Sequence, residues 1–218
     1  MRLKHIKGAE EVIKQGKYII EYPEEYKGKW DTVFQNKNPI YLEIGTGKGD
    51  FLIQNACCYP YVNFIGIEKY DSVLIRAIQK SNELELSNLK FIKMDARKIE
   101  EIFDKEIDLI YLNFSDPWPK DRHAKRRLTS PIFLERYQSI FKGIKHIIMK
   151  TDNKDLFQYS LDSLKEFGYH IQYYTTDLYQ SDRLENNIAT EYEKKFVSRG
   201  VSICYLDAIM DKEKDKNE

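Results

Sequence analysis

The chain lacks long hydrophobic runs and an even set of cysteines. None of its apolar stretches approaches the roughly 20 residues that a membrane-spanning helix needs, and its charged first residues are not followed by a hydrophobic signal segment. Its three cysteines are an odd number, and Cys57 and Cys58 are adjacent, so no disulfide framework can be read from them. We therefore expect a cytoplasmic protein with reduced thiols and no membrane partner.

The chain also lacks an excess of charge, an internal repeat and a metal motif. Its 35 basic and 35 acidic residues give a formal net charge of zero, so any nucleic-acid site must be a local patch. No group of His, Cys and carboxylate residues has the spacing of metal ligands, so no metal is expected. The sequence indicates no obligate protein partner, and either a monomer or a homodimer is compatible with it.

The length allows one sizeable core and is short for two independent domains. Of the 218 residues, 42% are hydrophobic and 32% are charged, a mixture typical of a globular fold. Residues 1–38 are polar, carry scattered aromatics and show no clear period, so they are interpreted as an N-terminal extension that covers the core. The domain itself is predicted over 39–210, followed by a charged, disordered tail over 211–218.

Short apolar runs alternate with helical patterns along the domain. Buried strands are predicted at 40–44, 62–67, 89–92, 109–114 and 144–150. Apolar residues at three- and four-residue spacing predict helices at 51–58, 73–86, 132–141 and 156–167. Candidate helix caps precede them at Asp50, Asp71, Ser130 and Asp152. The alternation predicts an α/β fold with a doubly wound, parallel sheet.

Two more strand-like stretches, 170–176 and 201–206, follow the last predicted helix. A polar loop that contains Asp182, Arg183, Thr190 and Glu193 separates them. Because no crossover helix joins these stretches, we expect them to pair antiparallel at one edge of the sheet.

A glycine-rich turn lies between the first predicted strand and the first helix, at Glu43-Ile44-Gly45-Thr46-Gly47-Lys48-Gly49-Asp50. This is the place where an open sheet binds a nucleotide-like ligand. The dinucleotide fingerprint would require glycine at position 50, where this chain has aspartate. A P-loop is excluded because Lys48 is not followed by Ser or Thr. The turn therefore indicates a ligand without a pyrophosphate.

Acidic residues end three successive strands. Glu43 lies at the glycine turn, Glu68 follows the second strand, where a carboxylate can accept both ribose hydroxyls, and Asp95 follows the third strand, within reach of an adenine amino group. S-adenosylmethionine carries a sulfonium and an ammonium group and no phosphate, so acids near the turn attract it. The glycines alone would be equally typical of a tight βα unit, in which the acids are solvated loop residues or helix caps. The glycine turn and the three acids together predict an S-adenosylmethionine site.

The fourth predicted strand ends in Asn113-Phe114-Ser115-Asp116-Pro117-Trp118-Pro119-Lys120. Its prolines stiffen the backbone at the edge where chemistry on such sheets occurs. Asp116 is the candidate catalytic residue, since its carboxylate can accept hydrogen bonds from the N1 and amino groups of guanine. Trp118 can stack on a base, but a tryptophan more often packs on a core or an edge.

A basic loop follows directly. Residues 120–127 hold five full positive charges in eight positions, together with His123. Such a run can be a solvated surface, but its position beside the predicted catalytic edge favours RNA phosphates as its ligand. The predicted RNA-binding residues are Arg122, His123, Lys125, Arg126 and Arg127.

These motifs together resemble the bacterial tRNA (guanine-N7-)-methyltransferase family. The resemblance rests on the glycine turn at 43–49, the segment at 113–120 and the Arg-His-x-Lys-Arg-Arg loop. It continues through Lys150-Thr151-Asp152 and Thr190-Glu191-Tyr192-Glu193-x-Lys195-Phe196, and so covers about 40–209. Residues 1–38 carry little of it.

The resemblance implies a class I, Rossmann-like methyltransferase fold with a mostly parallel seven-stranded sheet and an antiparallel strand at its edge. It implies methyl transfer from S-adenosylmethionine, which leaves S-adenosylhomocysteine, to N7 of guanine 46 in the variable loop of tRNA. The cofactor contacts that it implies are Glu43, Gly45, Gly47, Gly49, Glu68, Asp95 and Asp116. The substrate contacts that it implies are Lys120, Asp152, Thr190, Glu191, Tyr192 and Glu193.

Two alternative functions remain open from the residues. Ser115-Asp116-Pro117-Trp118 is similar to the Asp-Pro-Pro-Tyr type of motif, which holds an exocyclic amine in amino-methyltransferases of RNA or DNA bases. Trp118 stands where that motif has its second proline, which favours the N7 target. A non-catalytic RNA-binding module would use the basic loop alone and would have no affinity for S-adenosylmethionine.

Overall fold

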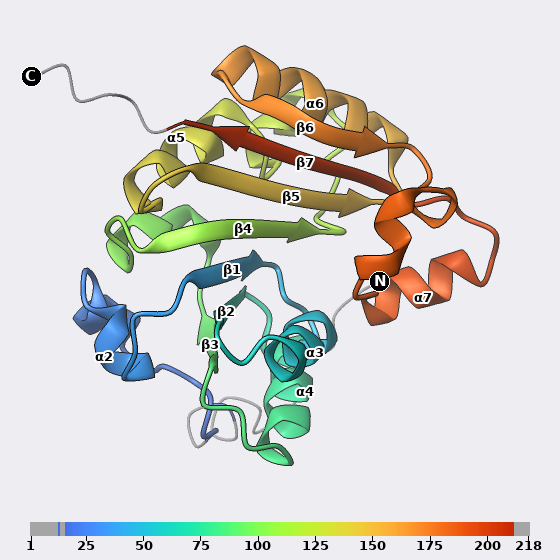
Figure 1. Ribbon diagram of the computed structural model, residues 1–218. Coiled ribbons are helices and arrows are strands. Elements are labelled where there is room, and N and C mark those ends of the chain that lie inside the picture. Colours follow the sequence, from blue (N-terminus) through green and yellow to red (C-terminus); the bar gives the residue numbers. More distant parts are fainter. Residues whose placement is uncertain (1–12, 14–15, 212–218) are drawn as a thin grey trace, which may run out of the picture.

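The computed structural model describes Ile13 and residues 16–211. Residues 1–12, 14–15 and 212–218 lie outside the described residues, and with them the first part of the predicted extension and nearly all of the predicted tail. The described residues form one seven-stranded sheet in the order β3-β2-β1-β4-β5-β7-β6 (Figure 1). No helix among them is long and apolar enough to cross a membrane.

The first five strands are parallel and agree with the predicted ones to within two residues. They are β1 (Ile40–Ile44), β2 (Asn63–Glu68), β3 (Leu89–Lys93), β4 (Ile107–Asn113) and β5 (Lys145–Thr151). The parallel, doubly wound sheet that the alternation predicts is therefore confirmed.

The last two strands, β6 (His170–Thr175) and β7 (Cys204–Met210), pair antiparallel, as predicted. β7 is inserted between β5 and β6 and pairs antiparallel with both, so β6 forms the edge of the sheet. β7 begins later and ends later than the predicted 201–206. Its register explains the difference, because it pairs along the whole of β5, from Cys204 opposite Thr151 to Met210 opposite Lys145.

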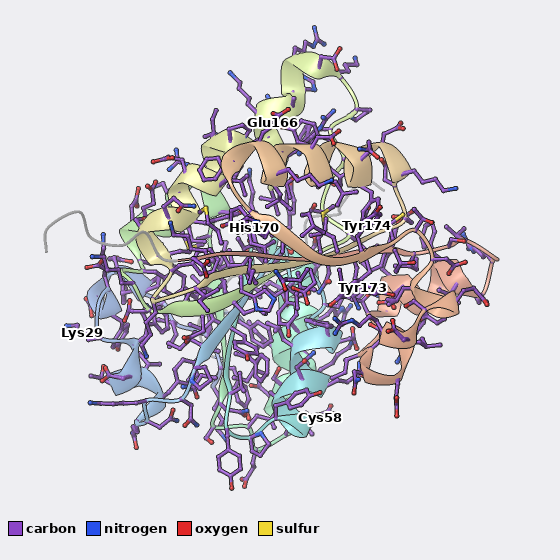
Figure 2. The ribbon with its side chains drawn as sticks, turned by 45° about the horizontal axis from the view of Figure 1, so that its top comes forward. Lys29, Cys58, Glu166, His170, Tyr173 and Tyr174 are labelled. Carbon is purple, nitrogen blue, oxygen red and sulfur yellow. The ribbon has the colours of Figure 1, made fainter. Side chains whose placement is uncertain are left out.

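Helices cover both faces of the sheet. α3 (Asp50–Cys58) and α4 (Asp71–Asn82) pack on one face, whereas α5 (Pro131–Ile140) and α6 (Lys154–Phe167) pack on the other. Figure 2 shows the two layers through Cys58 at the end of α3 and Glu166 on α6, which lie on opposite sides of the sheet. Neighbouring strand residues serve opposite faces, as strand geometry requires, so that Phe64 joins the α3–α4 core and Ile65 the α5–α6 core.

The predicted helix 73–86 was too long, since α4 ends at Asn82. The hydroxyl of Tyr18 takes the place of a further helical turn: it donates to the carbonyl of Leu84 and accepts from the backbone N–H of Leu86. Tyr18 is 66 residues away from Leu84 in sequence, so the helix pattern alone did not indicate this end.

The described part of the predicted N-terminal extension lies against the core. Ile20 and Tyr18 exchange backbone hydrogen bonds with Phe91 of β3. Trp30, at the start of the short helix α2 (Trp30–Phe34), is fully buried, and its indole N–H donates to the carbonyl of Ile102 at 2.8 Å. Two aromatic side chains in a polar segment thus close one side of the fold.

Candidate functional site

A cleft of about 800 Å³ opens at the carboxyl ends of the parallel strands. It runs from the glycine turn, across the ends of β2 and β3, to the loop after β4 and the basic loop. The predicted site residues that line it are Gly45, Glu68, Asp95, Asp116, Lys125 and Arg126. The fold therefore brings the acidic strand ends and the basic loop to one cavity, although up to 81 residues separate Gly45 from Arg126.

The glycine turn is held by the end of β2. Gly47 has a positive φ of 57°, and its N–H donates to Glu68 Oε2 at 3.0 Å. Gly49 has a φ of 77°, and an added Cβ would stand 2.7 Å from the Cβ of Ala77. Glycine is required at both positions, at the first by conformation and at the second also by close packing on α4.

Glu68 ends β2 and is nearly buried. Besides Gly47, its carboxylate accepts from the backbone N–H groups of Lys69 and Tyr70, at 2.7 and 2.9 Å. Burial raises the pKa of Glu68, and the three backbone hydrogen bonds oppose that rise. The carboxylate thus ties the glycine turn to the β2 end while it borders the cleft.

Glu43 lies beneath the turn rather than in the lining of the cleft. It is 2% exposed and accepts hydrogen bonds from the hydroxyl of Thr46 at 2.6 Å and from the amide of Asn113 at 2.7 Å. Burial raises its pKa to about 7, although both hydrogen bonds and the ammonium of Lys150 oppose the rise. Thr46 and Asn113 carried no signal of this role in the sequence.

Asp95 follows β3, and its carboxylate is paired with two basic side chains. It pairs with the guanidinium of Arg97 and with the ammonium of Lys69, each at 2.8 Å, and it accepts the backbone N–H of Arg97. The hydrogen bonds from Arg97 hold the pKa of Asp95 well below its usual value. The carboxylate is therefore charged and fixed at the wall of the cleft.

Asp116 is exposed between two strained residues. Phe114 and Trp118 have positive φ angles of 51° and 43°, a conformation that side chains other than glycine rarely adopt. Among the described residues, no hydrogen bond or ion pair occupies the Asp116 carboxylate, which lines the cleft. Backbone strain of this kind costs on the order of 1–3 kcal/mol per residue, and it persists only where the surroundings impose it.

Arg127 holds this strained loop. Its guanidinium donates to the carbonyls of Pro117 and Trp118, at 3.1 and 3.2 Å, and its Cζ lies 4.2 Å from the centre of the Tyr159 ring. The sequence predicted a phosphate contact for Arg127, but in this arrangement its donors serve the loop that carries Asp116.

The other predicted RNA-binding residues are more open. Arg122, Lys125 and Arg126 are exposed, and so is Lys120, the predicted substrate contact that begins the loop. The guanidinium of Arg126 lies 4.8 Å from the centre of the Trp118 ring, and His123 makes an edge contact with the same ring at 5.8 Å. Trp118 therefore packs within the basic loop rather than in the core, and four cations remain available for phosphates.

The segment at 190–193 reaches the site from the far end of the chain. It begins α7 (Glu191–Val197), which lies beyond the carboxyl ends of β4 and β5 (Figure 1). Glu191 pairs with Lys48 of the glycine turn, and the hydroxyl of Tyr192 donates to Asp152 at 3.3 Å. Asn153, rather than the predicted Asp152, caps α6, so that Asp152 stays available at the β5 end. The predicted substrate residues 152 and 190–192 are thus brought together.

Glu193 differs from its neighbours because it is fully buried. It pairs with Lys150 and closes a capping box with Thr190, whose hydroxyl accepts the Glu193 N–H at 2.9 Å. The resemblance implies a substrate contact for Glu193, but in this arrangement its carboxylate is not open to a guanine. This segment was expected to be a polar loop, but it begins a helix. Thr190-x-x-Glu193 is the signature of a helix start and predicts α7.

The cleft fits S-adenosylmethionine in three respects. First, the acids Glu68, Asp95 and Asp116 line it. Second, apolar residues such as Ile67, Met94 and Phe133 line its walls. Third, the N–H of Gly47 in the glycine turn already donates to the carboxylate of Glu68, whereas a phosphate ligand would need that N–H as a free donor. In addition, Asn113 Oδ1 is buried beside Glu43 with no hydrogen-bond partner among the described residues. An unsatisfied acceptor next to a carboxylate suits a cationic ligand. Among the residues that the structure describes, no three His, Cys, Asp or Glu side chains are grouped closely enough to hold a metal ion.

Solved structures with the same architecture are methyltransferases. The 16S rRNA methyltransferase KamB superposes with a TM-score of 0.65 at 10% identity, over 85% of this chain and 94% of that chain. A methyltransferase from Aquifex aeolicus described as S-adenosylmethionine-dependent superposes with a TM-score of 0.54 at 16% identity, over 94% and 99%. At such identities the likeness concerns the fold, which is that of the class I S-adenosylmethionine-dependent methyltransferases and confirms the predicted fold class.

Sequence comparison narrows the class. A family described as putative methyltransferases matches residues 37–206. The tRNA (guanine-N(7)-)-methyltransferase of Lachnoclostridium phytofermentans is 51% identical over 98% of this chain and 100% of its own length, and that of Bacillus licheniformis is 45% identical over 95% and 98%. The chain belongs to the tRNA (guanine-N(7)-)-methyltransferase family.

Proposed function

We propose that this chain transfers the methyl group of S-adenosylmethionine to N7 of a guanine in tRNA and releases S-adenosylhomocysteine. The observation that carries the proposal is the position of Asp116. Its free carboxylate lies in the cleft between the acidic glycine turn and the basic loop, where a donor and an RNA base can meet. The family resemblance adds guanine 46 of the variable loop as the target. The odd, partly adjacent cysteines favour the cytoplasm as the place of action.

The acidic strand ends support donor binding. Bound S-adenosylmethionine supplies an electrophilic methyl group on a sulfonium. Glu68 borders the cleft and is placed to accept hydrogen bonds from its adenosine, and the carboxylate of Asp95 adds a fixed negative charge at the wall. Glu43, whose pKa burial raises to about 7, adds negative charge beneath the turn in its ionised form, which a cationic ligand favours. No described cluster of ligands suggests a metal, and the reaction does not require one.

Asp116 favours the transfer electrostatically. Guanine N7 has a lone pair at neutral pH and no proton to lose, so the reaction needs no general base. Positive charge passes to the purine during the transfer, and the carboxylate of Asp116, on a loop that Arg127 supports, stabilises that charge. Asp152 and Tyr192 lie next to each other at the β5 end and are candidates to grip the donor edge of the base. The chain then contributes alignment and charge rather than acid or base chemistry.

The basic loop supports RNA binding. Lys125 and Arg126 line one end of the cleft, and Lys120 and Arg122 are exposed on the same loop, so that the four can neutralise phosphates near the target nucleotide. In folded RNA the N7 atom must become accessible, either in an exposed loop or by rotation of the nucleotide out of its stack.

The test is methyl transfer from labelled S-adenosylmethionine to unmodified tRNA, followed by digestion and identification of the nucleosides by mass spectrometry. We expect 7-methylguanosine, and no product on the same tRNA with adenine at position 46 as the matched control. A methyl group on an exocyclic amine would replace the proposal with the amino-methyltransferase alternative. A chain that binds tRNA but shows no heat of binding with S-adenosylmethionine would be an RNA-binding module.

A further inference from the structure

Lys150 near the end of β5 has a buried ammonium, which is uncommon and needs a reason. Its side chain is 3% exposed. The ammonium donates to Glu193 Oε2 at 2.6 Å, to Asn187 Oδ1 at 3.0 Å and to the carbonyl of Ile188 at 2.9 Å. All three acceptors belong to the segment 187–193, so that every N–H of this lysine is directed at one stretch of chain.

Glu193 is the matching feature on that segment. Its second oxygen accepts from the amide of Asn187 at 2.6 Å and from the hydroxyl of Tyr179 at 3.2 Å. It is also the one buried residue of α7. Most helices attach to a domain through an apolar stripe, whereas α7 attaches through a buried carboxylate and the lysine that neutralises it.

The remaining described links of this helix start are weaker. The ion pair of Glu191 with Lys48 is exposed to solvent, and exposed pairs of this kind contribute little. Tyr192 is 43% exposed and reaches Asp152 through a long hydrogen bond of 3.3 Å. The ring of Tyr192 also lies 5.0 Å from the ring of Phe114, which lines the cleft. The pair between Lys150 and Glu193 is thus the buried charged link that holds Thr190, Glu191 and Tyr192 beside Asp152 and Phe114.

We infer that Lys150 is a positioning residue, whose buried ammonium fixes the segment 187–193 and thereby sets the start of α7 against Asp152 for binding of the target base. The inference rests on the proposed function for its last step, whereas the anchoring itself does not. The anchor at Lys150 on β5 and the candidate base contact at Asp152, directly after β5, are then only two residues apart. Removal of the anchor leaves the donor cleft standing, because Lys150 is not part of its lining.

The experiment compares Lys150→Met with the full-length parent chain. Hydrogen–deuterium exchange of the free protein is expected to show lost protection over α7 and unchanged protection over β1 to β5. With unmodified tRNA at saturating donor, kcat/KM is expected to fall on the order of 100-fold, because displaced binding groups cost that much in aligned reactions. The Kd for S-adenosylmethionine, measured by calorimetry, is expected to change by less than about fivefold, since donor site and anchor share no lining residue.

Lys145→Met, on the same strand and outside both sites, is the matched control and is expected to leave all three measurements unchanged. If Lys150→Met does not fold, Glu193→Gln tests the same pair, since glutamine keeps the shape and the capping box while it removes the charge; the same pattern is expected. Unchanged exchange over α7, or unchanged kcat/KM despite lost protection, would overturn the inference. A parent chain that does not methylate tRNA would overturn the proposed function instead, and the exchange data would still decide the anchoring.

Discussion

Asp116 and Glu43 show that two carboxylates of one site can be held in opposite ways. Asp116 is exposed on a strained loop and free of partners among the described residues. Glu43 is buried and bonded to Thr46 and Asn113. The first is suited to interact with a ligand that comes and goes. The second ties the glycine turn to the end of β4, and burial raises its pKa to about 7.

Replacing Asp116 with asparagine should slow the chemical step and leave binding nearly intact. The amide keeps the shape of the side chain but removes the negative charge that favours methyl transfer. The loss of one such electrostatic contact costs on the order of 10²- to 10³-fold in kcat. Single-turnover rates at saturating tRNA and donor measure the step directly, and a turnover equal to that of the parent chain would remove Asp116 from the reaction.

Glu43 makes the stability of the fold depend on pH. Its pKa is about 7 in the folded chain against 4.5 for an ordinary glutamate. Between these values the folded state binds more protons than the unfolded state, so stability falls as pH rises from about 4.5 to 7, by about 3 kcal/mol at most. Glu43→Gln should flatten this part of the profile and be relatively more stable than the parent at pH 8. Urea unfolding at pH 5 and pH 8 provides the measurement, and parallel profiles would contradict the expectation.

At the scale of elements, the basic loop divides into two functions. Arg127 donates to the carbonyls of Pro117 and Trp118 and so supports the strained turn around Asp116. Arg122 and Lys125 are exposed and have no such structural bonds among the described residues. A charge run that looks uniform in the sequence therefore combines loop support with surface charge.

The double variant Arg122→Ala and Lys125→Ala should weaken tRNA binding and reduce its salt dependence. Each lost phosphate contact lowers the slope of log K against log salt by about 0.7 to 0.9. Arg127→Ala, the comparison variant, should keep most of the slope and lower kcat, because Asp116 loses its support. Binding measured at several salt concentrations separates the two. Equal slopes for the double variant and the parent chain would exclude the loop from the RNA site.

At the scale of the whole molecule, both faces of the sheet are covered by helices and the ends of its strands meet at one cleft. A ligand that binds this cleft stabilises the fold as a unit. S-adenosylmethionine at 100 times its Kd should add about 2.7 kcal/mol, which corresponds to a rise in Tm of about 5–10 °C for a domain of this size. Thermal unfolding with a nicotinamide dinucleotide or a nucleoside triphosphate is the control, and a rise with either of these but not with S-adenosylmethionine would contradict the assignment of the cleft.

The sequence by itself determined the chain order of the seven strands and of helices α3 to α6, the glycine turn, and the place of the acids and of Asp116 at the strand ends. These features depend on residues close together in the chain: apolar periodicity, turn chemistry, and the rule that parallel strands end at the same edge. The capping box at 190–193 was equally local, and the helix it starts could have been predicted from it.

Only the tertiary structure decided which charged groups are buried and what they hold. Glu43 meets Asn113 across 70 positions, Lys150 meets Glu193 across 43, and Tyr18 ends α4 across 66. It also decided that β7 lies between β5 and β6. These contacts follow from the packing of elements that are distant in the chain, and burial sets the energy of each charge. A local sequence pattern contains neither the packing of distant elements nor the burial of a charge.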